Sequence, residues 1–220
     1  DTDCAAVDAG TISQLATAFA RLGGALPDGD MRMFWSSLMR ALVSHGRSAE
    51  LGAQYSSKHL ANLVTGLAHR TAVREPGHAG AMTVLGALLC DEGQERLGGL
   101  NDRALALAAR LILPTVTGSN DPSAASAAED AAHDDGQPRG QPPWLSTLLD
   151  EVCRRAPNFS AADQSLILNA LARSGGIHGG SASPAPRGRA AEEPGCEPPR
   201  LEAPIFVCAD ALAGALAERL

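Results

Sequence analysis

The chain has 220 residues, a formal net charge of −7, and 45% hydrophobic but only 3% aromatic residues. That is enough apolar material for one sizeable core or a short repeat array, built mostly from Ala, Leu and Val. The negative charge argues against a free-standing, highly basic nucleic-acid-binding domain. No apolar run approaches the roughly 18 residues needed to span a bilayer, so we expect no membrane partner.

The first predicted helix, "DAGTISQLATAFARLG", carries a pattern that three later segments repeat. We call these four segments type-B helices: 8–23, 56–70, 101–113 and 159–175. Aligned without gaps, they place one apolar residue each in a shared column: Phe19, Leu67, Ile112 and Leu171. Three copies also have a large apolar residue four positions earlier: Leu15, Leu63 and Ile167. This helical spacing indicates one buried face.

The ends of the type-B segments are marked by local signals. Each segment opens on a residue suited to capping a helix N-terminus: Asp8, Ser56, Asn101 and Ser160. Gly23 and Gly175 are expected to end the first and last copies. Small residues precede the shared column and would let a neighbouring helix come close: Ala18, Gly66 and Ala170.

A second helix type alternates with the first along the chain. Its four segments have apolar residues at three- and four-residue steps, and we call them type-A helices: 31–46, 79–93, 142–158 and 203–220. One hairpin of this kind cannot bury its apolar faces alone, so neighbouring hairpins must stack. The expected fold is all-α, an α-solenoid of about four stacked A/B helical hairpins. The one strand-like fragment, "PIFVC" at 204–208, is too short to change this prediction.

The predicted organisation has five parts. They are the first part of the helical-repeat array at 1–114, an acidic low-complexity insertion at 115–141, the best-formed repeat at 142–175, a Gly/Pro/Ala-rich linker at 176–203, and a terminal helix at 204–220. The insertion holds five acidic residues and one arginine. Such composition is typical of disorder, or of a segment draped on a partner.

One stretch resembles a known repeat family. "PPWLSTLLDEVCRRAPNFSAADQSLILNALARSG" at 142–175 is similar to one repeat of the octotricopeptide family and its relatives, the heptatricopeptide repeats that accompany RAP domains and the FAST-kinase-like repeats. The Pro-Pro-Trp start, the Leu-rich first helix, the "FSAADQ" turn and the "LILNALARSG" second helix carry the resemblance. It implies an α-solenoid that binds organellar RNA and acts in transcript stability, splicing, translation or the mitochondrial ribosome. The acidity of this chain favours a protein wedged into a large ribonucleoprotein through a few Arg contacts.

Catalytic and metal-binding motifs are absent from the sequence. It has no His-Glu-x-x-His, no phosphate-binding Gly-rich loop and no dinucleotide fingerprint. The five cysteines include no Cys-x-x-Cys, which is typical of a reducing compartment and argues against zinc; Cys90 and Cys153 are expected to be core thiols. His59 and His69 project to different sides of one helix, so they are not expected to share a metal. We predict no enzyme activity, no cofactor and no small-molecule substrate.

Candidate RNA contacts are polar residues away from the apolar face of the helices. Nine belong to type-B helices: Arg21, Lys58, His59, Asn62, His69, Arg103, Gln164, Asn169 and Arg173. Arg154 and Arg155 add two on a type-A helix. Arg21, His69 and Arg173 stand two residues past the shared column and would form a weak basic stripe. A cation near a helix C-terminus also has a structural explanation, because it interacts favourably with the helix dipole.

The leading functional hypothesis is therefore a non-enzymatic helical-repeat protein of an organellar ribonucleoprotein. A mitochondrial ribosome subunit that contacts rRNA and neighbouring proteins is the favoured identity, with the mitochondrion as its location and the plastid as the alternative. The competing hypothesis is a protein-binding α-solenoid scaffold of an organellar complex without RNA contact, which the acidity favours. Salt dependence separates the two, because phosphate contacts weaken in proportion to the counterions released.

Overall fold

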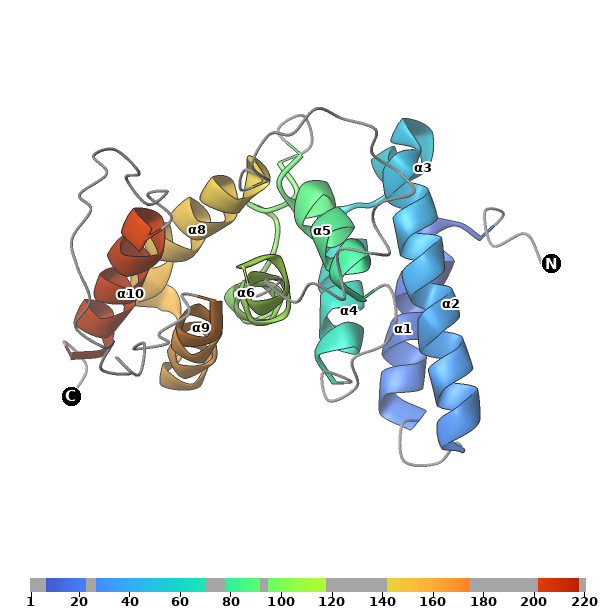
Figure 1. Ribbon diagram of the computed structural model, residues 1–220, viewed down its shortest axis with the longest axis horizontal. Helices are drawn as coiled ribbons and strands as arrows, with labels where there is room; N and C mark the ends of the chain where they lie inside the picture. The colour runs from blue at the N-terminus through green and yellow to red at the C-terminus, as the bar shows by residue number, and fades with distance from the viewer. Residues whose placement is uncertain are drawn as a thin grey trace, which may run out of the picture.

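The computed structural model describes residues 7–22, 27–69, 78–91, 95–117, 142–174 and 202–217. In these ranges the chain has nine α-helices, one short 3-10 helix and no strand (Figure 1). The predicted all-α class is confirmed. Some predicted features lie outside the described residues: Gly23, Gly175, residues 118–141 of the insertion and residues 176–201 of the linker.

All four predicted type-B helices form. They are α1 (Ala9–Leu22), α4 (Ser57–Ala68), α6 (Asp102–Thr117) and α9 (Ala161–Ser174). All four predicted N-caps are confirmed, because each cap's side-chain oxygen accepts a hydrogen bond from the backbone N–H three residues later, at 2.8–3.3 Å. These bonds satisfy N–H groups that have no partner inside the helix, and so they define where each helix begins.

The four type-A helices form as well. They are α2 (Asp28–Arg47), α5 (His78–Leu89), α8 (Trp144–Arg154) and α10 (Glu202–Ala217). The strand-like fragment 204–208 is helical within α10, as expected. Two short elements are additional to the prediction: α3 (Ala49–Ala53) after α2, and η3 (Ala156–Asn158) between α8 and α9.

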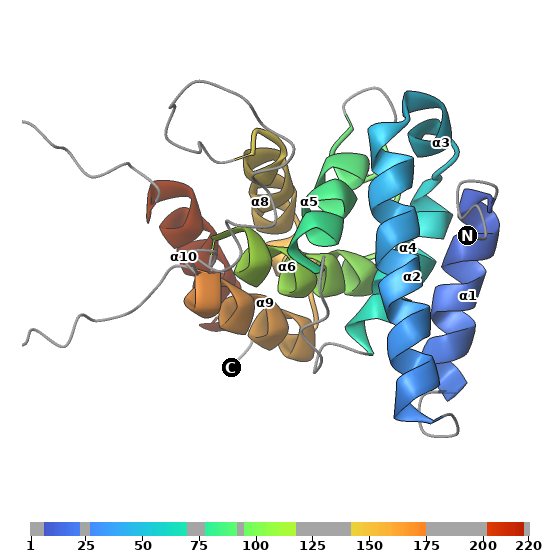
Figure 2. The ribbon, with the colours of Figure 1, turned by 45° about the vertical axis from the view of Figure 1, so that its right-hand side comes forward.

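The long helices pack in two rows, and successive long helices along the chain belong to alternate rows (Figure 1, Figure 2). In one row α1 packs on α4, α4 on α6, and α6 on α9. In the other row α2 packs on α5, α5 on α8, and α8 on α10. The central helix α6 contacts α4, α5, α8 and α9, and its residues 104–109 are all buried. A helix with neighbours on several sides is expected to be apolar over most of its circumference, and residues 104–109 of α6 contain only Ala and Leu.

α1 and α4 run in the same direction and touch along their length. Gly10 lies beside His59 near the start of both helices, and Ala16 lies against Gly66 further on. A Cβ on Gly66 would lie 2.7 Å from the backbone carbonyl of Ala16. The helices therefore come this close only because residue 66 has no side chain, and the predicted role of Gly66 is confirmed.

The predicted buried face is present on the inner type-B helices and incomplete on α1. Three residues of the shared column are buried: Leu67, Ile112 and Leu171. Phe19 is half-buried and stacks on Phe34 with 3.5 Å between ring centroids. Leu15 is 39% exposed and Ala18 is exposed, whereas Leu63, which aligns with Leu15, is fully buried. The reason is position, because within the described residues α1 ends its row and has a type-B neighbour on one side only.

Arg96, a buried arginine in the turn before α6, forms hydrogen bonds to both α3 and α5. The Arg96 side chain is 2% exposed, and its guanidinium donates hydrogen bonds to the carbonyls of Leu88 at 3.1 Å and Gly52 at 2.9 Å. It also lies 3.5 Å from a carboxylate oxygen of Asp91. Leu88 and Gly52 stand near the C-terminal ends of α5 and α3, where carbonyls lack partners inside the helix. Arg96 therefore joins α3 to α5, a role that no sequence pattern indicated.

His45 and Tyr55 form a buried polar pair between α2 and the turn before α4. The two residues are 0% and 1% exposed, and the Tyr55 hydroxyl lies 3.2 Å from His45 Nδ1. Burial lowers the pKa of His45, and the charge of Asp8 opposes this only in part. Burial also raises the pKa of Tyr55. Both side chains are therefore neutral at pH 7.

The neutral state of His45 predicts a loss of stability in mild acid. Its pKa is lower in the folded chain than in the unfolded chain, where it is about 6.5, so the unfolded chain binds more protons as the pH falls. The stabilisation is complete above about pH 6.5 and is lost as the pH falls through the folded pKa. Between about pH 7 and pH 5.5 we expect His45→Gln to reduce the slope of unfolding free energy against pH, by at most about 1.4 kcal/mol per pH unit.

Urea unfolding of both proteins at several pH values measures this difference. His78, whose pKa burial also lowers, is unchanged in both proteins and contributes equally to their slopes. Identical slopes in the natural chain and in His45→Gln would contradict the prediction.

Candidate functional site

The eleven candidate RNA contacts have different environments in the structure. Five are exposed, and their side chains form no hydrogen bond or ion pair with other described residues: Arg21, Lys58, His69, Asn169 and Arg173. The other six are buried, paired with carboxylates or placed in contacts between helices: His59, Asn62, Arg103, Arg154, Arg155 and Gln164. The five exposed residues are the ones that can reach an RNA without rearrangement of the fold.

Arg155 is a buried anchor, so the structure does not place it on the exposed surface that was expected of an RNA contact. It is 8% exposed, and its guanidinium donates hydrogen bonds to the carbonyls of Leu100 at 2.6 Å and Gly98 at 2.8 Å and to the Glu151 carboxylate at 2.6 Å. It thereby holds the turn before α6 against the end of α8. Successive residues of a helix project about 100° apart, so Arg154 and Arg155 point in different directions, and only Arg154 points toward solvent.

Gln164 is also buried, although the sequence predicted it to lie away from the apolar face of its helix. It is 0% exposed, and its side-chain amide donates a hydrogen bond to the Ala156 carbonyl in η3 at 3.0 Å. In the repeat alignment Gln164 occupies the position held by Ile12 and Leu60, both of which are buried. The repeat therefore directs this side chain into the core, and two apolar residues at the aligned position are the signal that indicates it.

Two further arginines are exposed but paired with carboxylates. Arg103 on α6 forms an ion pair with Asp163 on α9. Burial disfavours ionisation of Asp163, yet hydrogen bonds from Ser160 and Arg103 lower its pKa overall. Arg154 donates to both carboxylate oxygens of Glu151, at 2.6 and 2.7 Å, and these bonds lower the pKa of Glu151. A phosphate would have to compete with these carboxylates for either arginine.

His59 and Asn62 lie half-buried on the side of α4 that meets α1. His59 completes the cap of α4, with its Nδ1 3.2 Å from the Gln54 carbonyl and 3.5 Å from the Ser56 nitrogen. The Asn62 carbonyl accepts a hydrogen bond from the Thr17 hydroxyl of α1 at 3.2 Å. Both residues therefore belong to the contact between two helices.

Arg21, His69 and Arg173 remain as the candidate basic stripe. They occupy one repeat position at the C-terminal ends of α1, α4 and α9. Arg21 and His69 stand on neighbouring helices that run in the same direction. The equivalent residue of α6 is Pro114, which is half-buried, so the stripe is interrupted there. The structure thus places Arg21 and His69 on adjacent helices and separates Arg173 from them by α6.

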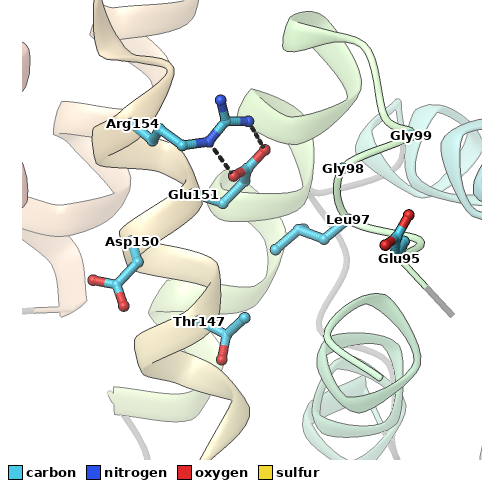
Figure 3. Close-up of a pocket in the computed structure, with 8 residues that line it drawn as sticks. All are labelled: Glu95, Leu97, Gly98, Gly99, Thr147, Asp150, Glu151 and Arg154. Carbon is cyan, nitrogen blue, oxygen red and sulfur yellow. Dashed lines mark hydrogen bonds and ion pairs between the residues drawn. The ribbon is translucent and has the colours of Figure 1, made fainter. Parts of the chain in front are cut away.

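An open depression of about 700 Å³ lies between α8 and the turn before α6 (Figure 3). Its lining residues are Glu95, Leu97, Gly98, Gly99, Thr147, Asp150, Glu151 and Arg154. Glu95 and Asp150 are exposed, whereas Glu151 is held by Arg154 through the two bonds drawn in Figure 3. Because its free charges are acidic, the depression repels phosphate and would attract a cationic group.

The thiols that the structure describes lie wholly or partly inside the fold. Cys90 is 8% exposed, and burial raises its pKa to about 12, so it is a protonated thiol at pH 7. Cys153 is half-buried, and burial raises its pKa as well. Among the described residues, no three His, Cys, Asp or Glu side chains gather as a metal site. No helix in the described ranges combines the length and apolarity that a membrane span requires.

Comparison of the chain with protein-family models, with curated proteins and with solved structures gives no significant match. The likeness of residues 142–175 to octotricopeptide-type repeats is therefore a resemblance of sequence pattern, and the function is argued from that pattern together with the geometry of the described residues.

Proposed function

We propose that this chain is a non-enzymatic α-solenoid of stacked helical hairpins and that it serves as an RNA- and protein-binding component of an organellar ribonucleoprotein. Two features support the solenoid. Helices of each type pack in chain order in their own row. One pair of contacting positions also recurs between neighbouring helices of the type-B row, because Gly10 beside His59 and Arg103 paired with Asp163 occupy aligned positions.

The RNA part of the proposal is carried by one observation, the recurrence of an exposed and unpaired basic residue at one repeat position. Arg21, His69 and Arg173 hold that position and are each exposed. The guanidinium fork of the two arginines matches the geometry of a phosphate. The mitochondrial ribosome, with rRNA as the bound RNA and the mitochondrion as the location, is proposed from the resemblance of residues 142–175 to octotricopeptide-type repeats.

RNA affinity across a salt series tests this function. The probe is a fluorescein-labelled single-stranded oligoribonucleotide, and Arg21→Ala combined with Arg173→Ala removes both arginines of the stripe. Each lost phosphate contact should reduce the slope of log affinity against log salt by about 0.7, so the double variant should bind every sequence more weakly with a slope lower by about 1.4. The matched control combines Arg32→Ala and Arg47→Ala, two exposed arginines of α2, and should change binding little.

Equal weakening by the two double variants, or no binding of the natural chain at low salt, would overturn RNA binding through the stripe. In organelle lysate we expect the native chain to sediment with a ribosomal particle and to lose that association after RNase treatment. An RNase-resistant complex would instead favour the protein-binding scaffold.

A further inference from the structure

The contact between α1 and α4 has two complementary halves. α4 contributes His59, Asn62 and Gly66, which meet α1 at three successive points. We call the side of a type-B helix that carries these positions, together with that of Leu63, its receiving face. α1 contributes Gly10, Ala16 and Thr17 at the matching turns, and the buried Ser13 lies on the same side of the helix. We call the side that carries these positions the inserting face.

The contact between α6 and α9 repeats this arrangement. Asp163 on α9 aligns with His59, and its partner Arg103 on α6 aligns with Lys58 and therefore with Gly10. The receiving position Ile167, which aligns with Leu63, is 0% exposed, as Leu63 is. The two interfaces therefore share one aligned pair of contacting positions, and both receiving helices bury the large apolar residue at the position of Leu63.

At one end of the row, α1 has a receiving face on which none of the described helices packs. Its four positions are Thr11, Gln14, Leu15 and Ala18, and all four are exposed. Leu15 is 39% exposed although its equivalents in α4 and α9 are buried, and Leu22, one turn after Ala18, is 48% exposed. The large apolar residue of this face is buried in α4 and α9 and is partly exposed to solvent in α1.

At the other end, α9 has an open inserting face. Its four positions are Ala162, Ser165, Leu168 and Asn169, of which three are exposed and Leu168 is half-buried. Their chemistry matches the inserting face of α1: a small residue first, a serine second, an apolar residue third and a hydrogen-bonding side chain fourth. None of the eight positions of the two open faces is a charged residue, although 20% of the chain is charged, so the face residues themselves bring no charge into the contact.

We propose that the occupant of each open face is a second copy of this chain. The receiving face of α1 in one copy stacks on the inserting face of α9 in the next, in the register that joins α1 to α4, and the copies associate end to end. The contact is continuous with the interfaces inside the chain and buries Leu15 and Leu22. The helices that end the other row, α2 and α10, also expose large apolar side chains, with Met33 66% and Val207 64% exposed.

This contact is heterologous, because the two copies use different surfaces, and it can therefore continue from copy to copy. The inference rests on the helical-repeat arrangement of the proposed function. It uses one of the candidate RNA contacts, Asn169, and leaves the basic stripe outside the contact. Arg21 and Arg173 lie outside both faces, so RNA affinity and self-association are separate readouts.

Sedimentation velocity of the purified, RNA-free chain at increasing protein concentration tests the proposal. The natural chain should show a sedimentation coefficient that rises with concentration. Leu15→Glu spoils only the receiving face and Ser165→Glu spoils only the inserting face, so each variant alone should stay monomeric at every concentration. A mixture of the two should form a one-to-one dimer and go no further, because one intact face of each kind remains. The control is Thr83→Glu, which places the same charge at an exposed position of the inner helix α5 and should associate as the natural chain does.

A natural chain that stays monomeric throughout the series would overturn the proposal. The open faces would then be candidates for contact with a helix of another protein. Association that persists in both single variants would place the contact elsewhere and would overturn it too. Circular dichroism confirms that each variant is folded, and if Leu15→Glu is not, Gln14→Glu tests the same face. The RNA titration repeated on Ser165→Glu should match the natural chain, so failure of the end-to-end contact and failure of RNA binding are told apart.

Discussion

Replacement of Arg155 by alanine is expected to lower the free energy of unfolding by about 3 kcal/mol. The substitution removes the hydrogen-bond donor from the carbonyls of Gly98 and Leu100 and from the half-buried carboxylate of Glu151. Buried acceptors that lose their donor retain their full desolvation penalty. Arg155→Lys should recover less than half of the loss, because a single ammonium group cannot replace a forked guanidinium. Urea denaturation followed by circular dichroism measures both effects.

Arg154 provides the matched control for this experiment. It is the same residue type at the next position and bonds the same carboxylate, but its side chain is 66% exposed whereas that of Arg155 is 10% exposed. Arg154→Ala should move the urea midpoint far less than Arg155→Ala, because exposed ion pairs contribute little. Similar midpoints for the two variants would show that pairing with Glu151, and not anchoring of the turn before α6, stabilises this end of α8.

Alanine at Gly66 is expected to destabilise the fold by about 1–3 kcal/mol, although alanine is the better helix former. The added Cβ would lie 2.7 Å from the backbone carbonyl of Ala16, which has no side-chain freedom with which to move away. α1 and α4 must then separate, and the buried contact around Ile12 and Leu63 opens. Thermal and urea unfolding measure the loss.

Gly214→Ala in α10 is the control, because a Cβ there would meet nothing within 4 Å. It should stabilise the chain by about 0.5–1 kcal/mol through helix propensity alone. The two substitutions are chemically identical and have opposite expected signs. Stabilisation by both would show that the approach of α1 to α4 is not limited by residue 66.

The fate of the candidate RNA contacts illustrates what a repeat alignment can and cannot predict. The alignment identified Arg21, His69 and Arg173 as one position, and all three are exposed. It also contained the signal for Gln164, whose aligned residues Ile12 and Leu60 are apolar. It contained no signal that Asp163 would pair with Arg103, because the aligned residues of α1 and α4, Gly10 and His59, are not a charged pair.

By itself the sequence determined the eight long helices of the described residues, the starts of the type-B helices and the two alternating types. Capping bonds reach three residues and the apolar spacing repeats within two turns, so both are legible without knowledge of the fold. Only the tertiary structure decided which polar and apolar side chains remain exposed to solvent and can contact another molecule. Arg155 is buried because the Leu100 carbonyl, 55 residues away in the chain, comes beside it, and Leu15 is exposed because none of the described helices packs on that face of α1. Such contacts join distant segments, and no local pattern records them.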